Sequence, residues 1–240
     1  MIGKSRNVRL TDRAALCHLS GCDVYSALRS KKIVRLTHTV RNEAEPQVTK
    51  TELAWQKGFS LTMVTSSADV SRVAIETTLG KIEIDLFPSA APITVANFLH
   101  YVEIGSYDGG TFHRTVTMEN QPNNQIRIEV IQAGMNPDRR SEKGAPIPLE
   151  RTTETGLRHV DGTISMGRSE PDTADEEIFI CIGDQPELDF GGRRNPDGQG
   201  FAAFGQVTSG MDVVRSIQKS PYVDQTLTPV IQITRIRIVE

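Results

Sequence analysis

The stretch V-A-I-E-T-T-L-G-K-I-E-I-D-L, residues 73–86, decides the fold. Val73 and Ile75 alternate with other side chains in its first half, and the same alternation returns over residues 82–86. A period of two places the apolar side chains of a β-strand on one face. Leu79-Gly80, between the two halves, supplies a turn. We therefore predict a hairpin with one buried face, whose outer edges other strands must extend or close.

Five further apolar runs have the length and residue types of short strands. They cover residues 111–116, 163–166, 178–182, 201–207 and 231–238. Asp161-Gly162 is a tight-turn signal before the second of these runs, and a glycine-rich loop at 191–200 precedes the fourth. In the last run Ile231 and Ile233 lie on one phase, whereas Ile236 and Ile238 lie on the other. This phase change predicts a β-bulge or a bend, which the closing of a barrel often requires.

Two isolated helices are predicted among these strands. The first begins around Ala91-Pro92, because proline suits a first helical turn, and its apolar residues recur with helical spacing over 95–102. Gly105 can end this helix in a left-handed conformation. The second is short, with Met211, Val214 and Ile217 on one side. Many short strands with two helices predict a mainly β fold, a closed antiparallel barrel with a helix at each end.

The composition is that of an ordinary soluble globular protein, with 38% hydrophobic and 24% charged residues. No run of 18 apolar residues occurs, so we predict no membrane-spanning segment. Cys17, Cys22 and Cys181 cannot all pair within one chain, and Cys181 stands in an apolar run typical of a buried thiol. His18 beside Cys17 lacks a second pair of ligands at zinc spacing, so we expect neither a metal site nor a disulfide.

Residues 1–69 differ from residues 70–240. The first 50 residues hold ten Lys/Arg against four Asp/Glu, and no long periodic segment precedes residue 70. We expect a basic, poorly ordered N-terminal extension. A targeting segment, a nucleic-acid arm and a natural start at Met63 remain open. Because only residues 14–17 form an apolar run near the start, we expect no secretory signal and a cytoplasmic protein. A periplasmic location remains the alternative if the true N-terminus differs.

Five motifs, taken in their order and spacing, carry a resemblance to a known family. They are T-F-H-R-T-V at 111–116, V-I-Q-A-G at 130–134, G-T-I-S-M-G-R at 162–168, E-E-I-F-I-C-I-G-D at 176–184 and G-F-A-A-F-G-Q-V at 200–207. Together they resemble the cyclophilins, the peptidyl-prolyl cis-trans isomerases, over roughly residues 70–240. The opening A-P-I-T-V-A-N-F of the first predicted helix is also similar to this family. The resemblance implies an eight-stranded barrel, in agreement with the strand pattern.

The implied activity is rotation about an X-Pro peptide bond. No covalent bond is made or broken, so the reaction needs no nucleophile, metal or cofactor. The obstacle is amide resonance, a barrier of roughly 18 to 20 kcal/mol. A donor aimed at the amide nitrogen, in surroundings that poorly solvate the planar amide, favours the twisted state. An acceleration of about 10⁵-fold needs about 7 kcal/mol, whereas one hydrogen bond to a charged group contributes about 1.5 to 3 kcal/mol. A single donor must therefore act together with an apolar pocket and a clamp on the substrate.

The resemblance also implies roles for individual residues. Arg114 matches the catalytic arginine, and Gln132 matches the partner that holds the arginine or the substrate carbonyl. Phe179 matches the aromatic residue beneath the proline ring. The other expected substrate-binding residues are the pocket wall Val130, Leu188 and Phe201, the peptide-pairing strand at Gly167 and Arg168, and Glu177, which stands in place of a usual glutamine. Pairing through the main chain predicts broad tolerance for proline-containing polypeptides.

Several positions depart from the family pattern. Glu129 stands where a pocket phenylalanine is usual, so we expect a shallower pocket or one re-formed by residues 118–125, which are interpreted as an inserted loop bordering the site. Glu187 stands where many members have the tryptophan associated with cyclosporin binding, so we expect weak cyclosporin binding. Phe201 replaces a common histidine, as in bacterial members. Glu176-Glu177 are interpreted as solvated or rim carboxylates, and Arg193-Arg194 as exposed loop charges.

Two functions remain open from the sequence. The favoured one is an isomerase acting on unfolded or extended chains, expected to be a monomer. The other takes the altered pocket as a sign of a cyclophilin-shaped binding module with little turnover. Nucleic-acid binding is expected only if the basic extension provides it.

Overall fold

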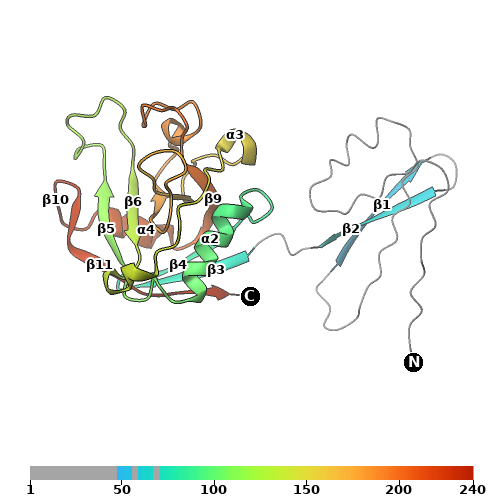
Figure 1. Ribbon diagram of the computed structural model, residues 1–240, viewed down its shortest axis with the longest axis horizontal. Helices are drawn as coiled ribbons and strands as arrows, with labels where there is room; N and C mark the ends of the chain where they lie inside the picture. The colour runs from blue at the N-terminus through green and yellow to red at the C-terminus, as the bar shows by residue number, and fades with distance from the viewer. Residues whose placement is uncertain (1–47, 56–58, 67–70, 240) are drawn as a thin grey trace. The chain divides into compact units, whose positions relative to one another are not determined.

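The computed structural model describes residues 48–55, 59–66 and 71–239 of the 240-residue chain. Its main body is a β-sheet closed on itself (Figure 1). The barrel strands are β3 (Ser71–Thr77), β4 (Gly80–Leu86), β5 (Thr111–Val116), β6 (Val130–Gly134), β7 (Thr163–Met166), β8 (Ile178–Cys181), β9 (Ala202–Ser209) and β11 (Thr226–Val239). They run in the order β11-β3-β4-β9-β7-β8-β6-β5, and β11 pairs again with β5. This closes an eight-stranded antiparallel barrel and confirms the predicted fold class.

The hairpin predicted at residues 73–86 is the pair β3–β4. Ile75 lies opposite Ile82 and Val73 opposite Ile84, and all four side chains are fully buried. Cross-strand apolar pairs on one face are the unit that stabilises a sheet. The two outer edges of the hairpin are extended as the pattern required, with β11 beside β3 and β9 beside β4.

The phase change in the last strand is a change of register in the structure. The pairing of β11 with β3 shifts between Ile233 and Arg235, which is the bulge that the isoleucine pattern predicts. Ile233 on one side of the shift and Ile236 on the other are both buried. The extra residue therefore lets one strand keep its apolar side chains in the core across a bend. A two-residue strand, β10 (Tyr222–Val223), pairs with the start of β11.

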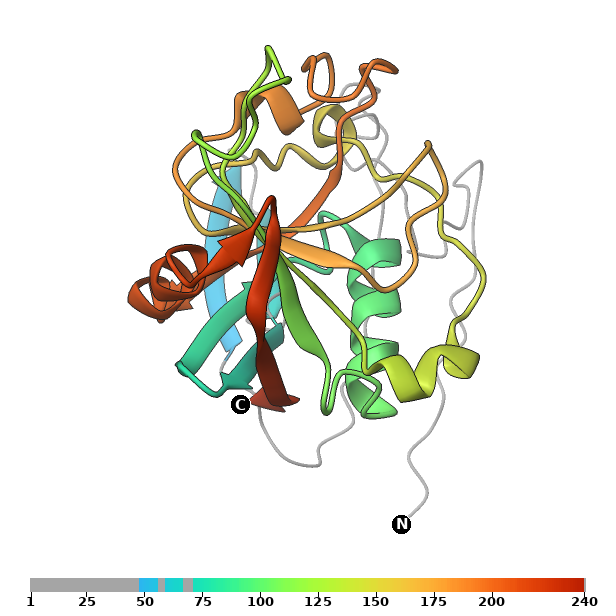
Figure 2. The same cartoon turned by 90° about the vertical axis from the view of Figure 1, so that its left-hand side faces the viewer.

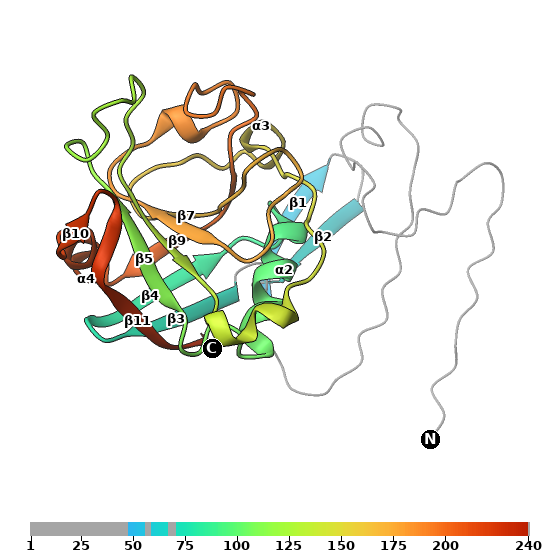
Figure 3. The same cartoon turned by 60° about the vertical axis from the view of Figure 1, so that its left-hand side comes forward.

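Two α-helices pack against the barrel core. Helix α2 (Pro92–Glu103) begins at the predicted proline and buries Val95 and Phe98, and Gly105 just beyond it has a φ of 70°. Helix α4 (Met211–Gln218) buries Val214 and Ile217. Figures 2 and 3 show these helices on opposite sides of the strands. The loops add a one-turn helix α3 (Thr152–Thr155) and the 3₁₀ helices η1 (Pro137–Glu142) and η2 (Pro186–Leu188).

A separate antiparallel hairpin is formed by β1 (Val48–Trp55) and β2 (Phe59–Ser66). Val48 pairs with Ser66 and Trp55 with Phe59. This hairpin was not predicted, because its sequence shows only short apolar islands. The remainder of the predicted extension, residues 1–47, 56–58 and 67–69, lies outside the described residues. In the described part of the chain, no helix has both the length and the apolar character needed to cross a membrane.

Candidate active site

Arg114 owes its position to a β-bulge in β5. Phe112 pairs with Ala133 of β6 and Arg114 pairs with Gln132, so His113 between them has no partner across the ladder. Successive residues of a strand face opposite sides, so without the bulge Phe112 and Arg114 would share a face. Instead Phe112 is fully buried in the main core, and Arg114 reaches a cavity on the opposite face of the same strands.

The guanidinium of Arg114 is held by two amide oxygens. Its Nη1 donates to Oε1 of Gln132 at 2.9 Å, and its Nε donates to Oε1 of Gln225 at 2.9 Å. The Nη2 group donates to the same oxygen of Gln225. Burial lowers the pKa of Arg114, although a guanidinium remains charged at neutral pH. Both partners are neutral, so the arginine is oriented while its positive charge is left uncompensated by them.

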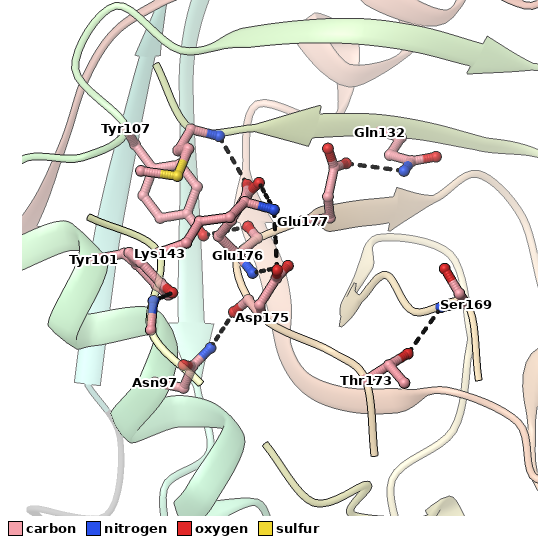
Figure 4. Close-up of polar contacts among 12 residues, drawn as sticks. Asn97, Tyr101, Tyr107, Gln132, Lys143, Ser169, Thr173, Asp175, Glu176 and Glu177 are labelled. Carbon is pink, nitrogen blue, oxygen red and sulfur yellow. Dashed lines mark hydrogen bonds and ion pairs between the residues drawn. The ribbon is translucent and has the colours of Figure 1, made fainter. Parts of the chain in front are cut away.

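Gln132 is itself oriented by a hydrogen bond to Glu177. Its Nε2 donates to a carboxylate oxygen of Glu177 at 2.9 Å, which turns its Oε1 toward Arg114 (Figure 4). Burial raises the pKa of Glu177, and the nearby His113 and the Gln132 hydrogen bond oppose this rise. His113 Nε2 lies 3.7 Å from the same carboxylate. Glu177 was predicted to bind substrate, but it does not line the cavity and instead supports Gln132.

The cavity beside Arg114 has a volume of about 240 Å³. It is lined by Arg114, Ile128, Val130, Gln132, Gly167, Arg168, Phe179, Leu188, Arg194, Asn195 and Phe201. The structure thus brings together eight of the nine predicted site residues, all but Glu177. Val130, Phe179 and Leu188 belong to a small apolar cluster that is separate from the barrel core. This apolar cluster forms one side of the cavity, and polar side chains converge on it from the other residues that line it, a combination usual for a small-ligand site.

The aromatic floor of the cavity is fixed by its neighbours. The ring of Phe179 meets that of Phe201 edge to face, with centroids 5.3 Å apart and planes at 87°. On its other side Phe179 stacks on His159 at 6.0 Å. The buried His159 ring lies between Asp189 (2.7 Å) and Ser165 (3.0 Å). Burial raises the pKa of Asp189, but the His159 hydrogen bonds outweigh it, so this pKa lies below its usual value.

The surroundings of Arg168 differ from those predicted, which placed it in the peptide-pairing strand. It follows the end of β7 rather than lying in the strand, and its side chain is fully buried. Two of its nitrogens donate to the Asp197 carboxylate at 2.7 and 2.9 Å, and Nε donates to the Gly200 carbonyl at 2.7 Å. The guanidinium also lies 5.1 Å from the centre of the Phe201 ring. Its side chain therefore fastens the 191–200 loop to the pocket wall.

Four residues at or beside the site were missed or misread: Ile128, Asn195 and Gln225 were not predicted, and Arg194 was expected to be exposed. Ile128 lines the cavity, whereas Glu129 bonds to Gln218 of α4, so the isoleucine supplies the wall that the glutamate cannot. Gln225, in the turn before β11, gave no signal in the sequence. Arg193 is exposed as predicted, but the same prediction for Arg194 was wrong, because Arg194 lines the cavity. Isolated loop residues carry no periodicity, so no pattern could place them.

The prediction of solvated or rim carboxylates was also wrong for Glu176, which is 4% exposed. Its carboxylate accepts from the backbone N–H of Met135 at 2.9 Å and pairs with Lys143 at 2.9 Å. Tyr107 donates to the backbone carbonyl of Glu176, and Lys143 also pairs with Asp175 (Figure 4). The buried charge is thus paired and hydrogen-bonded, which burial requires. The Asp175–Glu177 run anchors the start of β8, with Glu176 and Glu177 turned in different directions.

A family comparison agrees with this geometry. The family model described as "Cyclophilin type peptidyl-prolyl cis-trans isomerase/CLD" matches residues 72–238, more than half of the chain. The chain belongs to the cyclophilin family. This cyclophilin is a peptidyl-prolyl cis-trans isomerase, which confirms the favoured function and the resemblance seen in its motifs.

Relatives with curated names include several from bacteria. The cyclophilin is 35% identical over 150 residues to a peptidyl-prolyl cis-trans isomerase of Streptomyces antibioticus, covering 62% of this chain and 84% of the relative. It is 37% identical over 150 residues to one of Acinetobacter baylyi, covering 62% and 72%. A crystal structure of a cyclophilin-type isomerase from Cryptosporidium parvum has a TM-score of 0.58 at 22% identity, covering 71% of this chain and 98% of that one. This structural likeness supports the barrel fold.

Proposed function

We propose that this cyclophilin rotates X-Pro bonds in the cavity between Arg114 and Phe179. The observation that carries the proposal is the guanidinium of Arg114, fixed 2.9 Å from Gln132 at the edge of an apolar floor. When the X-Pro amide twists, its nitrogen regains a lone pair that a positive donor stabilises. The Phe179 and Phe201 rings would hold the pyrrolidine ring and disfavour the planar, more polar amide. Arg114 is the catalytic residue in this mechanism, and Gln132 positions it.

The bound chain would lie along the backbone that follows β7. Gly167 donates its N–H to the Glu177 carbonyl at 2.7 Å, and in the described part of the chain the Arg168 backbone N–H and C=O have no hydrogen-bond partner. Unpaired backbone groups beside a pocket are suited to an extended peptide, which pairs through its main chain. The substrate class would be polypeptides that contain proline. In support, a relative from Cryptosporidium parvum was crystallised in the presence of the dipeptide Ala-Pro.

Weak cyclosporin binding is part of the same proposal. Glu187 is ion-paired with Arg193 at 3.0 Å and also accepts from the Arg193 backbone N–H. A charged pair therefore occupies the place where a flat apolar ring is usual in cyclosporin-binding members. Calorimetric titration of cyclosporin into the full chain is expected to show weak binding, and a tight complex would contradict the proposal.

The direct test replaces Arg114 in the full-length chain. Loss of one charge-assisted hydrogen bond of about 1.5 to 3 kcal/mol predicts that Arg114→Ala lowers kcat/KM on a neutral proline peptide roughly 10- to 150-fold. Exchange spectroscopy measures interconversion of the cis and trans signals, and thermal unfolding checks that the barrel survives. Arg114→Lys keeps the charge but loses the planar guanidinium, so its kcat/KM should lie between those of wild type and Arg114→Ala. Unchanged catalysis by a folded Arg114→Ala protein would overturn the assignment.

A further inference from the structure

The cavity has an unusual distribution of charge. Three arginines, Arg114, Arg168 and Arg194, are among its lining residues, and no Asp or Glu is among the described residues that line it. The bidentate contact with Asp197 compensates Arg168. Arg114 contacts only amide oxygens, and Glu177 lies behind Gln132. Arg194 is the third cation, and it comes from the 191–200 loop.

Arg194 is held in place by neutral groups. Its Nη1 donates to Oε1 of Gln121 at 2.9 Å and to the backbone carbonyl of Ile126 at 2.7 Å. In the described part of the chain no carboxylate lies within ion-pairing distance of it. Two donors are therefore used for orientation, and the charge itself faces the cavity uncompensated. Arg193, the preceding residue, shows the contrast, because it is exposed and paired with Glu187.

Arg114 and Arg194, the two arginines among the described cavity residues without a direct carboxylate partner, influence each other. Burial lowers the pKa of Arg194, and the positive charge of Arg114 lowers it further. Like charges that share one partly buried cavity repel, and the repulsion is stronger there than in bulk water. An anionic group in the cavity would relieve this repulsion and accept a charge-assisted hydrogen bond from a guanidinium. A neutral acceptor would take the hydrogen bond but leave the repulsion in place, and a cationic group would add to the repulsion.

We propose that Arg194 makes this isomerase selective for prolines flanked by an acidic residue, whose carboxylate it receives in the cavity beside Arg114. The inference rests on the proposed function, because it places the proline of the substrate in the same cavity. Arg194 would be a specificity-determining residue with no part in the bond rotation itself. The expectation of broad substrate tolerance is thereby narrowed to a preference set by charge.

The test compares three matched peptides that differ only at the residue after proline, which is Glu, Gln or Lys. This position leaves the X-Pro bond unchanged, and Glu and Gln have nearly the same shape. For the wild-type full-length chain, kcat/KM from exchange spectroscopy is expected to be about tenfold higher for Glu than for Gln, which corresponds to about 1.4 kcal/mol, and lowest for Lys. A second set with the acid before proline covers the other flank, and a preference in either set supports the proposal.

Variants separate a charge preference from a structural role. Arg194→Gln is expected to bring the Glu-to-Gln ratio close to one, whereas Arg194→Lys keeps part of it. Arg193→Gln is the matched control, from the adjacent residue, and should leave the ratio as in wild type. Added salt should lower the ratio in wild type, since salt screens partly exposed charges.

The outcomes are distinct from those for Arg114. A wild-type ratio near one in both peptide sets would overturn the inference and leave the proposed function intact. An equal loss for all three peptides in Arg194→Gln would also overturn it, since that result means that Arg194 only fastens the 118–128 loop. If Arg114→Ala turned over the Gln peptide as fast as wild type, the proposed function itself would fail.

Discussion

Arg114 and Arg168 line the same cavity but have opposite surroundings. The side chain of Arg168 is fully buried, is bound by both oxygens of the Asp197 carboxylate and stacks against Phe201. Arg114 is bound by the neutral side-chain amides of Gln132 and Gln225. Both guanidinium groups are held in one orientation. Only the second keeps a charge that its partners do not compensate.

This difference separates a structural arginine from the one proposed to be catalytic. A carboxylate partner stabilises a guanidinium and also cancels its field, so the group can fasten a loop but offers little to a substrate. An amide partner fixes the direction of the N–H groups without cancelling the charge, which suits a donor that must act on a developing lone pair. The sequence alone could not assign these roles, because both residues are arginines that follow β-like runs.

The largest expected effect comes from replacing Arg168, the structural arginine of this comparison. Arg168→Met should lower the free energy of unfolding by about 2 to 3 kcal/mol, because Asp197 and the Gly200 carbonyl lose charge-assisted hydrogen bonds. Urea unfolding monitored by circular dichroism measures the change. Turnover of a bound peptide should fall less than in Arg114→Ala. Wild-type stability of Arg168→Met would show that the buried pair does not secure the loop.

A second experiment gives Arg114, the proposed catalytic arginine, a carboxylate partner like that of Arg168. Gln225→Glu places a carboxylate against Nε and Nη2 of Arg114 with almost no change of shape. Because the charge is then compensated, kcat/KM should fall about tenfold. Thermal stability should change little, because the new ion pair is offset by loss of the hydrogen bond that Gln225 Nε2 donates to the Asn120 carbonyl. Gln225→Leu removes one of the two groups that orient Arg114 but leaves the charge of Arg114 uncompensated. Its kcat/KM should therefore fall less than that of Gln225→Glu. The comparison is wrong if Gln225→Glu is as active as wild type.

The smallest expected effect concerns the residue behind Gln132. Burial raises the pKa of Glu177 above its unfolded value, so the folded state loses stability as the pH rises through the interval between the two values. Glu177→Gln removes this loss. The stability of the variant relative to wild type should therefore increase as the pH rises above the usual Glu pKa of about 4.3, as measured by urea unfolding at each pH. A stability difference independent of pH would contradict the assignment of the burial effect to this carboxyl.

Much of the fold was predictable because it rests on local periodicity. The strand at 163–166, the proline at the start of α2, the left-handed Gly105 and the bulge in the last strand were all predicted as the structure shows them. Each depends on side-chain spacing or on a backbone preference of one residue type. The predicted cavity residues also come together, apart from Glu177.

The remaining parts depend on contacts between distant loops. The burial of Glu176 requires Lys143, which a connecting segment brings from another part of the chain. Gln225 reaches Arg114 only because β11 closes the barrel against β5. Arg194 enters the cavity because the 191–200 loop folds back over it. None of these contacts has a signature in the order of neighbouring residues.

The bulge at His113 limits which sequence changes β5 can tolerate in evolution. Since His113 has no partner in the β5–β6 ladder, strand pairing does not constrain its identity, although its contact with Glu177 does; the number of residues there is constrained by the position of Arg114. Losing that one position would turn the Arg114 side chain inward among the hydrocarbon side chains, and the protein would forfeit both its packing and its chemistry at once. Insertions and deletions in this strand should therefore be far rarer among descendants than substitutions at the same place.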